Sequence, residues 1–345
     1  MANKGKISVG ISIGDLNGIG IEIILKTFED KRILELCDPV LFASKKAISK
    51  YRSILKINTP VQTIKTVDQM ISGKLNLINV WQEDVEITPG KANKTGGQYA
   101  FKSLEAAVQS LANDDIDFLL TAPINKETIQ SEDFAFPGHT EYLGEQFEGQ
   151  PLMILMQDNL RVALMTGHIP LDEVKKHITP ELIEAKVSLL NETLKQDFSI
   201  QKPRIAVLSL NPHAGDHGVI GKEDDEILAP TLENIRKKGT LVYGPYPSDS
   251  FFGSGHYQSF DAILACYHDQ GLTPFKTLAF GGGVNFTAGL SHLRVSPDHG
   301  TAFDIAGKGE ADHSSFKQAL YAGIDIFRRR TENRELKKNA LVSKS

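Results

Sequence analysis

Apolar and polar positions follow one another in two alternating patterns along this 345-residue chain. Short, near-continuous apolar runs predict buried strands at residues 7–13, 39–43, 75–80, 116–121, 152–156, 161–165, 205–210, 240–243 and 261–265. Apolar residues at helical spacing predict helices at residues 19–28, 44–56, around 101–111, 180–194, 223–237 and 314–329. This order of elements predicts an α/β protein with a largely parallel central sheet.

No repeat, low-complexity tract or long linker divides the sequence, and its length allows a large core. We therefore expect residues 1–330 to form a single catalytic unit of two intimately joined α/β lobes. Residues 331–345 are rich in Lys, Arg, Asn and Ser, which predicts a polar carboxyl-terminal tail.

Composition narrows the classes of partner and compartment. The net charge of -5 provides no basic surface, so nucleic acid is not an expected partner. Two cysteines are too few for a disulfide framework. The sequence has neither the pattern of a signal peptide nor the ~18 consecutive apolar residues of a membrane span. These features predict a soluble cytoplasmic protein.

Three predicted strands each lead to a histidine, namely His168, His213 and His268. Loops at the carboxyl ends of parallel strands converge, so these side chains are candidates for one metal site. Neutral imidazoles suit a borderline divalent ion, and three protein ligands leave a position open for substrate. The alternative is that each histidine is hydrogen-bonded near a strand end without binding metal.

Carboxylates and basic residues surround the same segments of the sequence. Asp269 follows a candidate ligand and could orient its imidazole or accept a proton. Asp249 could do the same, or could be a turn or helix-cap residue. Lys276, Asn285 and Arg294 form a second polar set that suits a phosphate or carboxylate.

Two further segments suggest anion and nucleotide contacts. His139 and Thr140 follow a Pro-Gly turn ahead of a predicted helix, whose amino terminus would favour an anion, although Thr140 could be a plain helix cap. The polar loop at residues 297–307 suits a nucleotide, with a structural loop as the rival interpretation. No G-x-G-x-x-G occurs, so NAD would not bind through a Rossmann phosphate turn. The candidate nucleotide contacts are Gly282, Gly283, His299, Gly300, Thr301 and Asp304. The glycines at residues 281–283 could equally form a tight turn.

Taken together, these motifs resemble the 4-hydroxythreonine-4-phosphate dehydrogenases of the PdxA family. The matching stretches are GD-x-x-GIG at residues 14–20, FPGHTE at 136–141, TGH-x-PL at 166–171, NPHAG at 211–215, YHDQGL-x-P-x-K at 267–276 and HGTAFDIAG at 299–307. The sequence departs from the family at Leu16 and Ile21, where proline is common, and at residues 216–220.

The resemblance implies an isocitrate/isopropylmalate dehydrogenase-like fold of two α/β lobes, with the active site in the cleft between them. It assigns the metal to His168, His213 and His268, the last supplied by the neighbouring subunit of a homodimer. It assigns substrate contacts to His139, Thr140, Lys276, Asn285 and Arg294. Asp249, Asp269 and Lys276 are the candidate acid–base residues.

The implied reaction oxidises 4-phosphooxy-L-threonine at C3 with NAD or NADP. The 3-keto acid then loses carbon dioxide to give 3-amino-2-oxopropyl phosphate, a step toward pyridoxal 5'-phosphate. The metal could be zinc, cobalt, magnesium, manganese or nickel. Two alternatives are a dehydrogenase of the same fold acting on another phosphorylated hydroxy acid or diol, and a metal-dependent phosphatase.

Overall fold

A computed structural model of the protein describes residues 6–339. Its internal contacts divide the chain into two compact units. Unit 1 comprises Met1–Gly149 and Leu290–Phe327, and unit 2 comprises Gln150–Gly289 and Arg328–Ser345. The predicted α/β class is confirmed.

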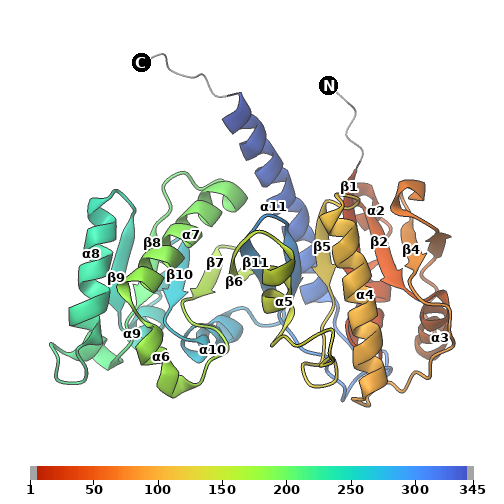
Figure 1. The fold of residues 1–345 in the computed structure, drawn as a ribbon, viewed down its shortest axis with the longest axis horizontal. Helices are drawn as coiled ribbons and strands as arrows, with labels where there is room; N and C mark the ends of the chain where they lie inside the picture. Colours follow the sequence, from red (N-terminus) through yellow and green to blue (C-terminus); the bar gives the residue numbers. More distant parts are fainter. Residues whose placement is uncertain (1–5, 340–345) are drawn as a thin grey trace. The chain divides into compact units, whose positions relative to one another are not determined.

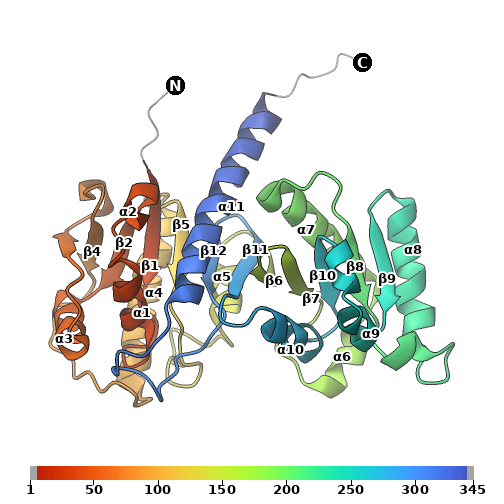
Figure 2. The same cartoon turned by 180° about the vertical axis from the view of Figure 1, so that it is seen from behind.

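Unit 1 is built on a sheet whose pairings are parallel (Figure 1). The strands lie in the order β3 (Val61–Ile64), β4 (Leu75–Asn79), β2 (Cys37–Ala43), β1 (Ile7–Ser12), β5 (Phe118–Thr121) and β12 (Arg294–Pro297). Helix α4 (Lys94–Ala112) covers one face. Figure 2 shows α1 (Gly20–Thr27) and the first part of α11 (Ser314–Lys338) on the other.

The core of unit 1 follows from the apolar spacing in α4. Leu104, Val108 and Leu111 are buried in one cluster with strand residues such as Phe42 and Leu119. Each fully buried leucine contributes about 1.5–3 kcal/mol relative to exposure. Polar caps set the helix starts: the Asn93 side chain accepts a hydrogen bond from the Gly96 amide at the start of α4.

Unit 2 has strands in the order β11 (Val284–Leu290), β6 (Gly149–Gln157), β7 (Leu160–Leu164), β10 (Ala262–Ala265), β8 (Ile205–Leu208) and β9 (Val242–Tyr246). Strands β6 and β7 form an antiparallel pair, whereas β7, β10, β8 and β9 pair in parallel. The carboxyl ends of β7, β10 and β8 therefore lie at one edge of the sheet.

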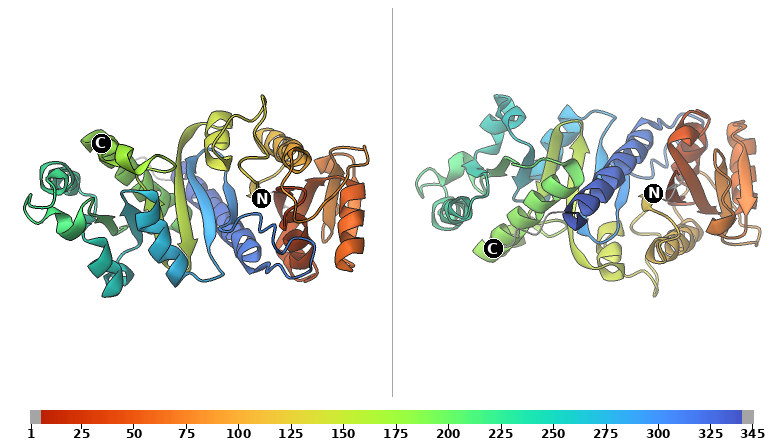
Figure 3. Two further views of the ribbon diagram at one scale, coloured as in Figure 1. Left: turned by 90° about the horizontal axis from the view of Figure 1, so that it is seen from below. Right: turned by 90° about the horizontal axis from the view of Figure 1, so that it is seen from above.

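Helices cover both faces of the unit 2 sheet as well. Helix α7 (Pro180–Phe198) lies on the face seen in Figure 1, and α9 (Ser248–Gly253) and α10 (His268–Leu278) lie on the face seen in Figure 2. The edge-on views of Figure 3 show this layering within each unit. Further helices are α6 (Leu171–His177) and α8 (Ala229–Lys237), the latter preceded by a π-helical turn at Asp224–Leu228.

Several elements differ from the sequence prediction. Strands β3, β11 and β12 were not predicted: β3 exposes Gln62 and Thr63, and β12 begins with the charged Arg294. Helix α11 continues to Lys338, so the predicted tail begins inside a helix, and residues 340–345 lie outside the described part. Over residues 6–339, the structure contains no helix with the length and apolar character needed to cross a bilayer.

Candidate functional site

Two of the three candidate metal ligands lie side by side in unit 2. His168 follows β7, and His268 is the first residue of α10, which begins after the two residues that follow β10. Strands β7 and β10 are adjacent and parallel, which brings the two histidines together. The ring centroids of His168 and His268 are 5.6 Å apart. Both rings line a pocket of about 410 Å³, whose other lining residues are Gly167, Ile169, Leu171, Val174, Tyr267 and Asp269.

Hydrogen bonds fix the strand ends that carry these histidines. The Thr166 hydroxyl donates to the Cys266 carbonyl at 2.7 Å, which joins the segments after β7 and β10. The Gln270 side chain accepts from the Cys266 amide at 2.8 Å and donates to the Ser209 carbonyl at 2.6 Å. Gln270 therefore connects the end of β10 to the end of β8, where His213 follows. Its position in the sequence alone did not reveal this role.

The carboxylate of Asp269 contacts Nδ1 of His268 at 2.7 Å. This contact orients the imidazole and leaves Nε2 as the nitrogen for a ligand. Asp249 is an exposed residue in the first turn of α9, and because Pro247 occupies the N-cap position, Asp249 is not the helix cap. It is not among the residues that line the histidine pocket.

His213 lies in the turn Pro212–Gly215 after β8 and is exposed. With metal–nitrogen distances of ~2.0–2.1 Å, two imidazoles on one ion have centroids roughly 5–6 Å apart. The separation of His168 and His268 fits that requirement. In the described part of a single chain, however, no group of three or more His, Cys, Asp or Glu side chains is arranged to hold a metal ion. The complete triad therefore stays a prediction.

A second cluster of site residues lies in unit 1, at the carboxyl end of β5. Arg294 is 3% exposed and donates two hydrogen bonds to the Thr121 hydroxyl, from Nε at 3.0 Å and from Nη2 at 2.7 Å. Burial lowers the pKa of the guanidinium to about 9, and the Glu141 carboxylate partly opposes this shift. Arg294 is therefore a buried cation at neutral pH.

His139, the first residue of α5 (His139–Gln146), belongs to the same cluster. Burial, together with the positive charges of Arg294 and Lys126, holds its pKa well below 6.5. The imidazole is therefore neutral at pH 7. Its Nε2 atom is enclosed and has no hydrogen-bond partner among residues 6–339. Thr140 follows in the first turn. A buried cation, an enclosed imidazole nitrogen and a nearby lysine together suit an anionic group.

Lys276 and Asn285 belong to unit 2. Lys276 is exposed on the last turn of α10, and Asn285 is the second residue of β11. The Asn285 Oδ1 atom is buried and accepts no hydrogen bond from any described residue. A buried amide oxygen of this kind can accept a hydrogen bond from a ligand. At Gly282, a Cβ atom would lie 2.7 Å from the end of the Gln157 side chain, a flexible group that can move aside.

The candidate nucleotide loop in unit 1 is attached to α1 at two points. Near its start, the Thr301 carbonyl accepts a hydrogen bond from the Ile19 amide at 3.1 Å. Beyond its end, the buried Glu22 carboxylate accepts from the Ala311 amide at 2.9 Å, and Lys26 donates to the same residue's carbonyl at 2.8 Å. Ile19, at the start of α1, therefore supports this loop, and Glu22 and Lys26 of α1 support the segment after it, roles that the sequence did not reveal.

Within the loop, His299 lies in a bend, Gly300 and Thr301 lie in irregular backbone, and Asp304 lies in the turns that follow. The His299 Nε2 atom is buried and finds no hydrogen-bond partner in the described part of the chain. Its Nδ1 contacts the Gly300 carbonyl at 3.0 Å. A nucleotide contact at these residues stays a prediction.

The sequence and the fold were compared with known proteins. The family model for "Pyridoxal phosphate biosynthetic protein PdxA" matches residues 35–323. A 4-hydroxythreonine-4-phosphate dehydrogenase of Bacteroides thetaiotaomicron is 48% identical over 98% of this chain and 93% of its own. A D-threonate 4-phosphate dehydrogenase of Cupriavidus necator is 36% identical over 93% of this chain and 98% of its own. A crystal structure of the 4-hydroxythreonine-4-phosphate dehydrogenase of Klebsiella pneumoniae has a similar fold, with a TM-score of 0.79 and 32% sequence identity. The match covers 94% of this chain and 99% of that one.

Proposed function

The chain belongs to the PdxA family and is a dehydrogenase of that type, and we propose that its substrate is 4-phosphooxy-L-threonine. The substrate assignment is supported by the 48% identity to a 4-hydroxythreonine-4-phosphate dehydrogenase, against 36% to a D-threonate 4-phosphate dehydrogenase. The C3 hydroxyl becomes a ketone: hydride passes to NAD or NADP and the hydroxyl proton passes to a base. The resulting 3-keto acid loses carbon dioxide to give 3-amino-2-oxopropyl phosphate, which serves pyridoxal 5'-phosphate synthesis.

The observation that carries this proposal is the cluster of Arg294, His139 and Lys126 in unit 1. A buried guanidinium is costly unless opposite charge compensates it, and the Glu141 carboxylate supplies part of that compensation. Arg294 keeps two of its N–H groups on Thr121, and His139 is held neutral beside it with Nε2 enclosed. We assign the phosphate of the substrate to this cluster, with Thr140, Lys276 and Asn285 as the further substrate contacts.

We assign a divalent ion to His168, His268 and His213. Such an ion would act as a Lewis acid that lowers the pKa of the substrate hydroxyl. Asp269 holds His268 through Nδ1 and so fixes the nitrogen that faces the pocket. Asp269, Asp249 and Lys276 are the candidates to accept the hydroxyl proton. All three side chains are exposed, and Asp269 lines the histidine pocket.

We assign the nicotinamide cofactor to the loop containing His299, Gly300, Thr301 and Asp304, with Gly282 and Gly283. The two attachments of this loop to α1 support the assignment, because a fixed loop loses little conformational entropy when a nucleotide binds. The buried Nε2 of His299 provides one polar atom for that contact.

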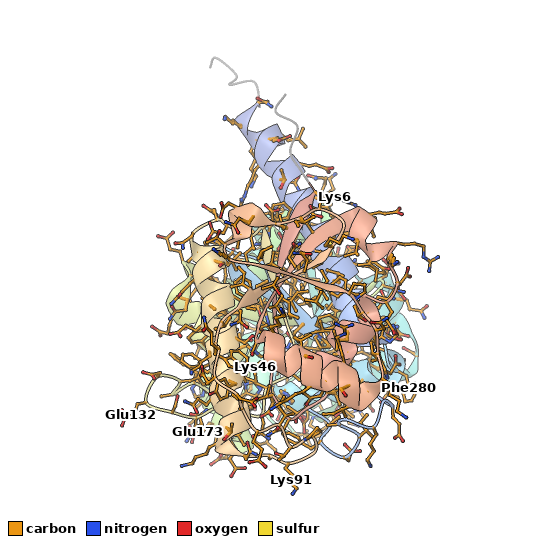
Figure 4. The ribbon with its side chains drawn as sticks, turned by 90° about the vertical axis from the view of Figure 1, so that its right-hand side faces the viewer. Lys6, Lys46, Lys91, Glu132, Glu173 and Phe280 are labelled. Atoms are coloured by element: carbon orange, nitrogen blue, oxygen red, sulfur yellow. The ribbon has the colours of Figure 1, made fainter. Side chains whose placement is uncertain are left out.

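We further propose a homodimer in which the partner subunit completes each metal site, with His268 as the shared ligand. One supporting observation is that the described residues of a single chain form no group of three metal ligands. Another is that exposed apolar side chains lie at the end of α10 and just beyond it: Leu278 is 46% exposed, and Phe280, labelled in Figure 4, is 93% exposed. Apolar surface of this kind is often covered by a subunit.

Parallel assays with two substrates test the assignment. Metal-loaded enzyme and NAD are mixed with 4-phosphooxy-L-threonine or with D-threonate 4-phosphate, and NADH formation is followed by absorbance. The proposal predicts a kcat/KM at least about tenfold higher for the threonine derivative, a difference of ~1.4 kcal/mol in transition-state binding. A higher kcat/KM for D-threonate 4-phosphate would contradict the proposal and would place this chain with the D-threonate 4-phosphate dehydrogenases.

A further inference from the structure

The segment that carries His213 has an uncommon backbone. Six consecutive residues have positive φ angles: His213 at 53°, Ala214 at 53°, Gly215 at 82°, Asp216 at 45°, His217 at 52° and Gly218 at 87°. Residues other than glycine visit this left-handed region singly, because the Cβ atom crowds the following carbonyl. Four of the six residues here are not glycine. The segment is therefore strained, and we call it the left-handed turn.

Hydrogen bonds inside the left-handed turn close it like one turn of a helix. The Asp216 amide donates to the His213 carbonyl at 3.2 Å, and the Gly218 amide donates to the Gly215 carbonyl at 3.0 Å. The same Gly215 carbonyl accepts from the Ile220 amide at 3.0 Å. These bonds define the shape of the turn, but they do not remove the crowding at the four residues that carry a Cβ.

The base of the left-handed turn is held by one buried carboxylate. Asp224 is fully buried at the start of the π-helical turn. Its Oδ1 accepts from the Leu210 amide at 2.8 Å, and its Oδ2 accepts from the Asn211 amide at 3.0 Å and from Asn211 Nδ2 at 2.9 Å. Three donors from two adjacent residues thus converge on a single side chain, immediately before Pro212 and His213.

Neighbouring groups strengthen the same attachment. Glu223 also accepts from Asn211 Nδ2, at 2.9 Å, and forms an ion pair with Lys175 of α6. Helix α6 contributes Leu171 and Val174 to the pocket that contains His168 and His268. A Cβ on Gly221 would lie 2.6 Å from Asn211 Nδ2, so the packing around Asn211 is tight. The attachment of the turn is therefore connected to one wall of the histidine pocket.

We propose that Asp224 is a positioning residue that holds the left-handed turn, so that His213 is placed for metal binding before the ion arrives. A strained backbone persists only where its surroundings determine it, and such segments concentrate at functional sites. Without the Asp224 carboxylate, the turn would relax and His213 would sample other positions. This inference rests on the proposed metal-dependent function.

The test compares Asp224→Asn with Asp225→Asn, an identical charge change at the exposed neighbouring residue. Each full-length protein is stripped of metal and titrated with Co²⁺ alone, followed by visible absorption and calorimetry, and its fold is checked by circular dichroism. We expect Asp224→Asn to weaken Co²⁺ binding about 10- to 100-fold and Asp225→Asn to leave it within about twofold. Adding His217→Gly to Asp224→Asn should restore part of the affinity, because glycine adopts positive φ without crowding.

The outcomes separate this inference from the function beneath it. A wild-type protein that binds no Co²⁺ would overturn the metal-dependent function and the inference with it. Wild-type binding that Asp224→Asn leaves unchanged would overturn the inference alone. If Asp224→Asn does not fold, His217→Gly and His217→Val test the inference instead. His217→Gly should keep or tighten Co²⁺ binding and raise the Tm. His217→Val should weaken Co²⁺ binding and lower the Tm. Equal effects of the two substitutions would overturn the inference.

Discussion

Arg294 donates two hydrogen bonds to the Thr121 hydroxyl, from Nε at 3.0 Å and from Nη2 at 2.7 Å. Strands β5 and β12 are adjacent and parallel, with Arg294 opposite Leu119, which brings the two side chains together. Thr121 therefore fixes the plane of the guanidinium. This orientation places the buried cation at the carboxyl end of β5, in the cluster to which we assign the phosphate.

Replacing Thr121 should reduce recognition of the phosphate. Thr121→Val keeps the shape but removes the acceptor of a charged hydrogen bond, a loss of ~1.5–3 kcal/mol. We expect kcat/KM for the phosphorylated substrate to fall about 10- to 100-fold, comparable with Arg294→Ala, and to change little for its dephosphorylated analogue. Thr121→Ser, which retains the hydroxyl, should stay close to wild type. Equal losses on both substrates would mean that the phosphate is held elsewhere.

His139 should make stability depend on pH in acid. Its folded-state pKa lies well below the unfolded value of 6.5. Below pH 6.5 the unfolded chain therefore binds a proton that the folded protein excludes, and stability falls as pH falls toward the folded pKa. The contribution is at most about 1.4 kcal/mol per pH unit and is absent above the unfolded pKa.

Denaturant unfolding of wild type and His139→Gln at several pH values between neutral and mildly acid measures this effect. The variant should lose less stability on acidification. Inorganic phosphate should also reduce the loss in the wild type, because a bound anion favours the imidazolium. Identical pH profiles of the two proteins, with and without phosphate, would contradict the burial of His139 beside Arg294.

Removing a candidate metal ligand should remove the ion. His168→Ala, His213→Ala and His268→Ala should each lose tightly bound divalent metal, measured by elemental analysis, and lower turnover by orders of magnitude while the fold survives. The exposed His217 offers a matched control, and His217→Ala should retain metal. A variant among the three that keeps full activity after chelator treatment would remove that residue from the site.

Mixed dimers test whether the site is shared. If the partner subunit's histidine completes each site, exchange between inactive His168→Ala and inactive His268→Ala proteins should restore about half of the wild-type rate per heterodimer. One of the two sites in each heterodimer would then contain only unmutated ligands, and the other would lack two. Mass spectrometry confirms the exchange. Confirmed exchange without recovered activity would favour the single-chain pair, whose rings are already 5.6 Å apart.

Apolar patterning predicted the elements that are apolar throughout, such as β8 and β10. It did not predict β12, because the charged Arg294 at its start is buried in the fold, where it hydrogen-bonds to Thr121, a residue far away in sequence. Strand-end histidines were identifiable as a group. Which of these histidines lie close together depends on the order of the strands in the sheet. The sequence did not reveal that β7 lies beside β10.

The left-handed turn illustrates a different limit. Positive φ angles are expected at glycine, but here they extend over His213, Ala214, Asp216 and His217. The cause is the tertiary contact of Asp224 with the preceding residues, which local sequence preferences do not encode. Likewise, the support that Glu22 gives to the segment after the candidate nucleotide loop joins residues 289 positions apart.

The most direct test of the central claim measures three products in one reaction. Metal-loaded wild-type protein is incubated with NAD and 4-phosphooxy-L-threonine, and NADH, carbon dioxide and free phosphate are quantified together. The account predicts equal amounts of NADH and carbon dioxide, no free phosphate, and loss of both products when a chelator removes the metal. Release of free phosphate without NADH would contradict it and would identify a metal-dependent phosphatase instead.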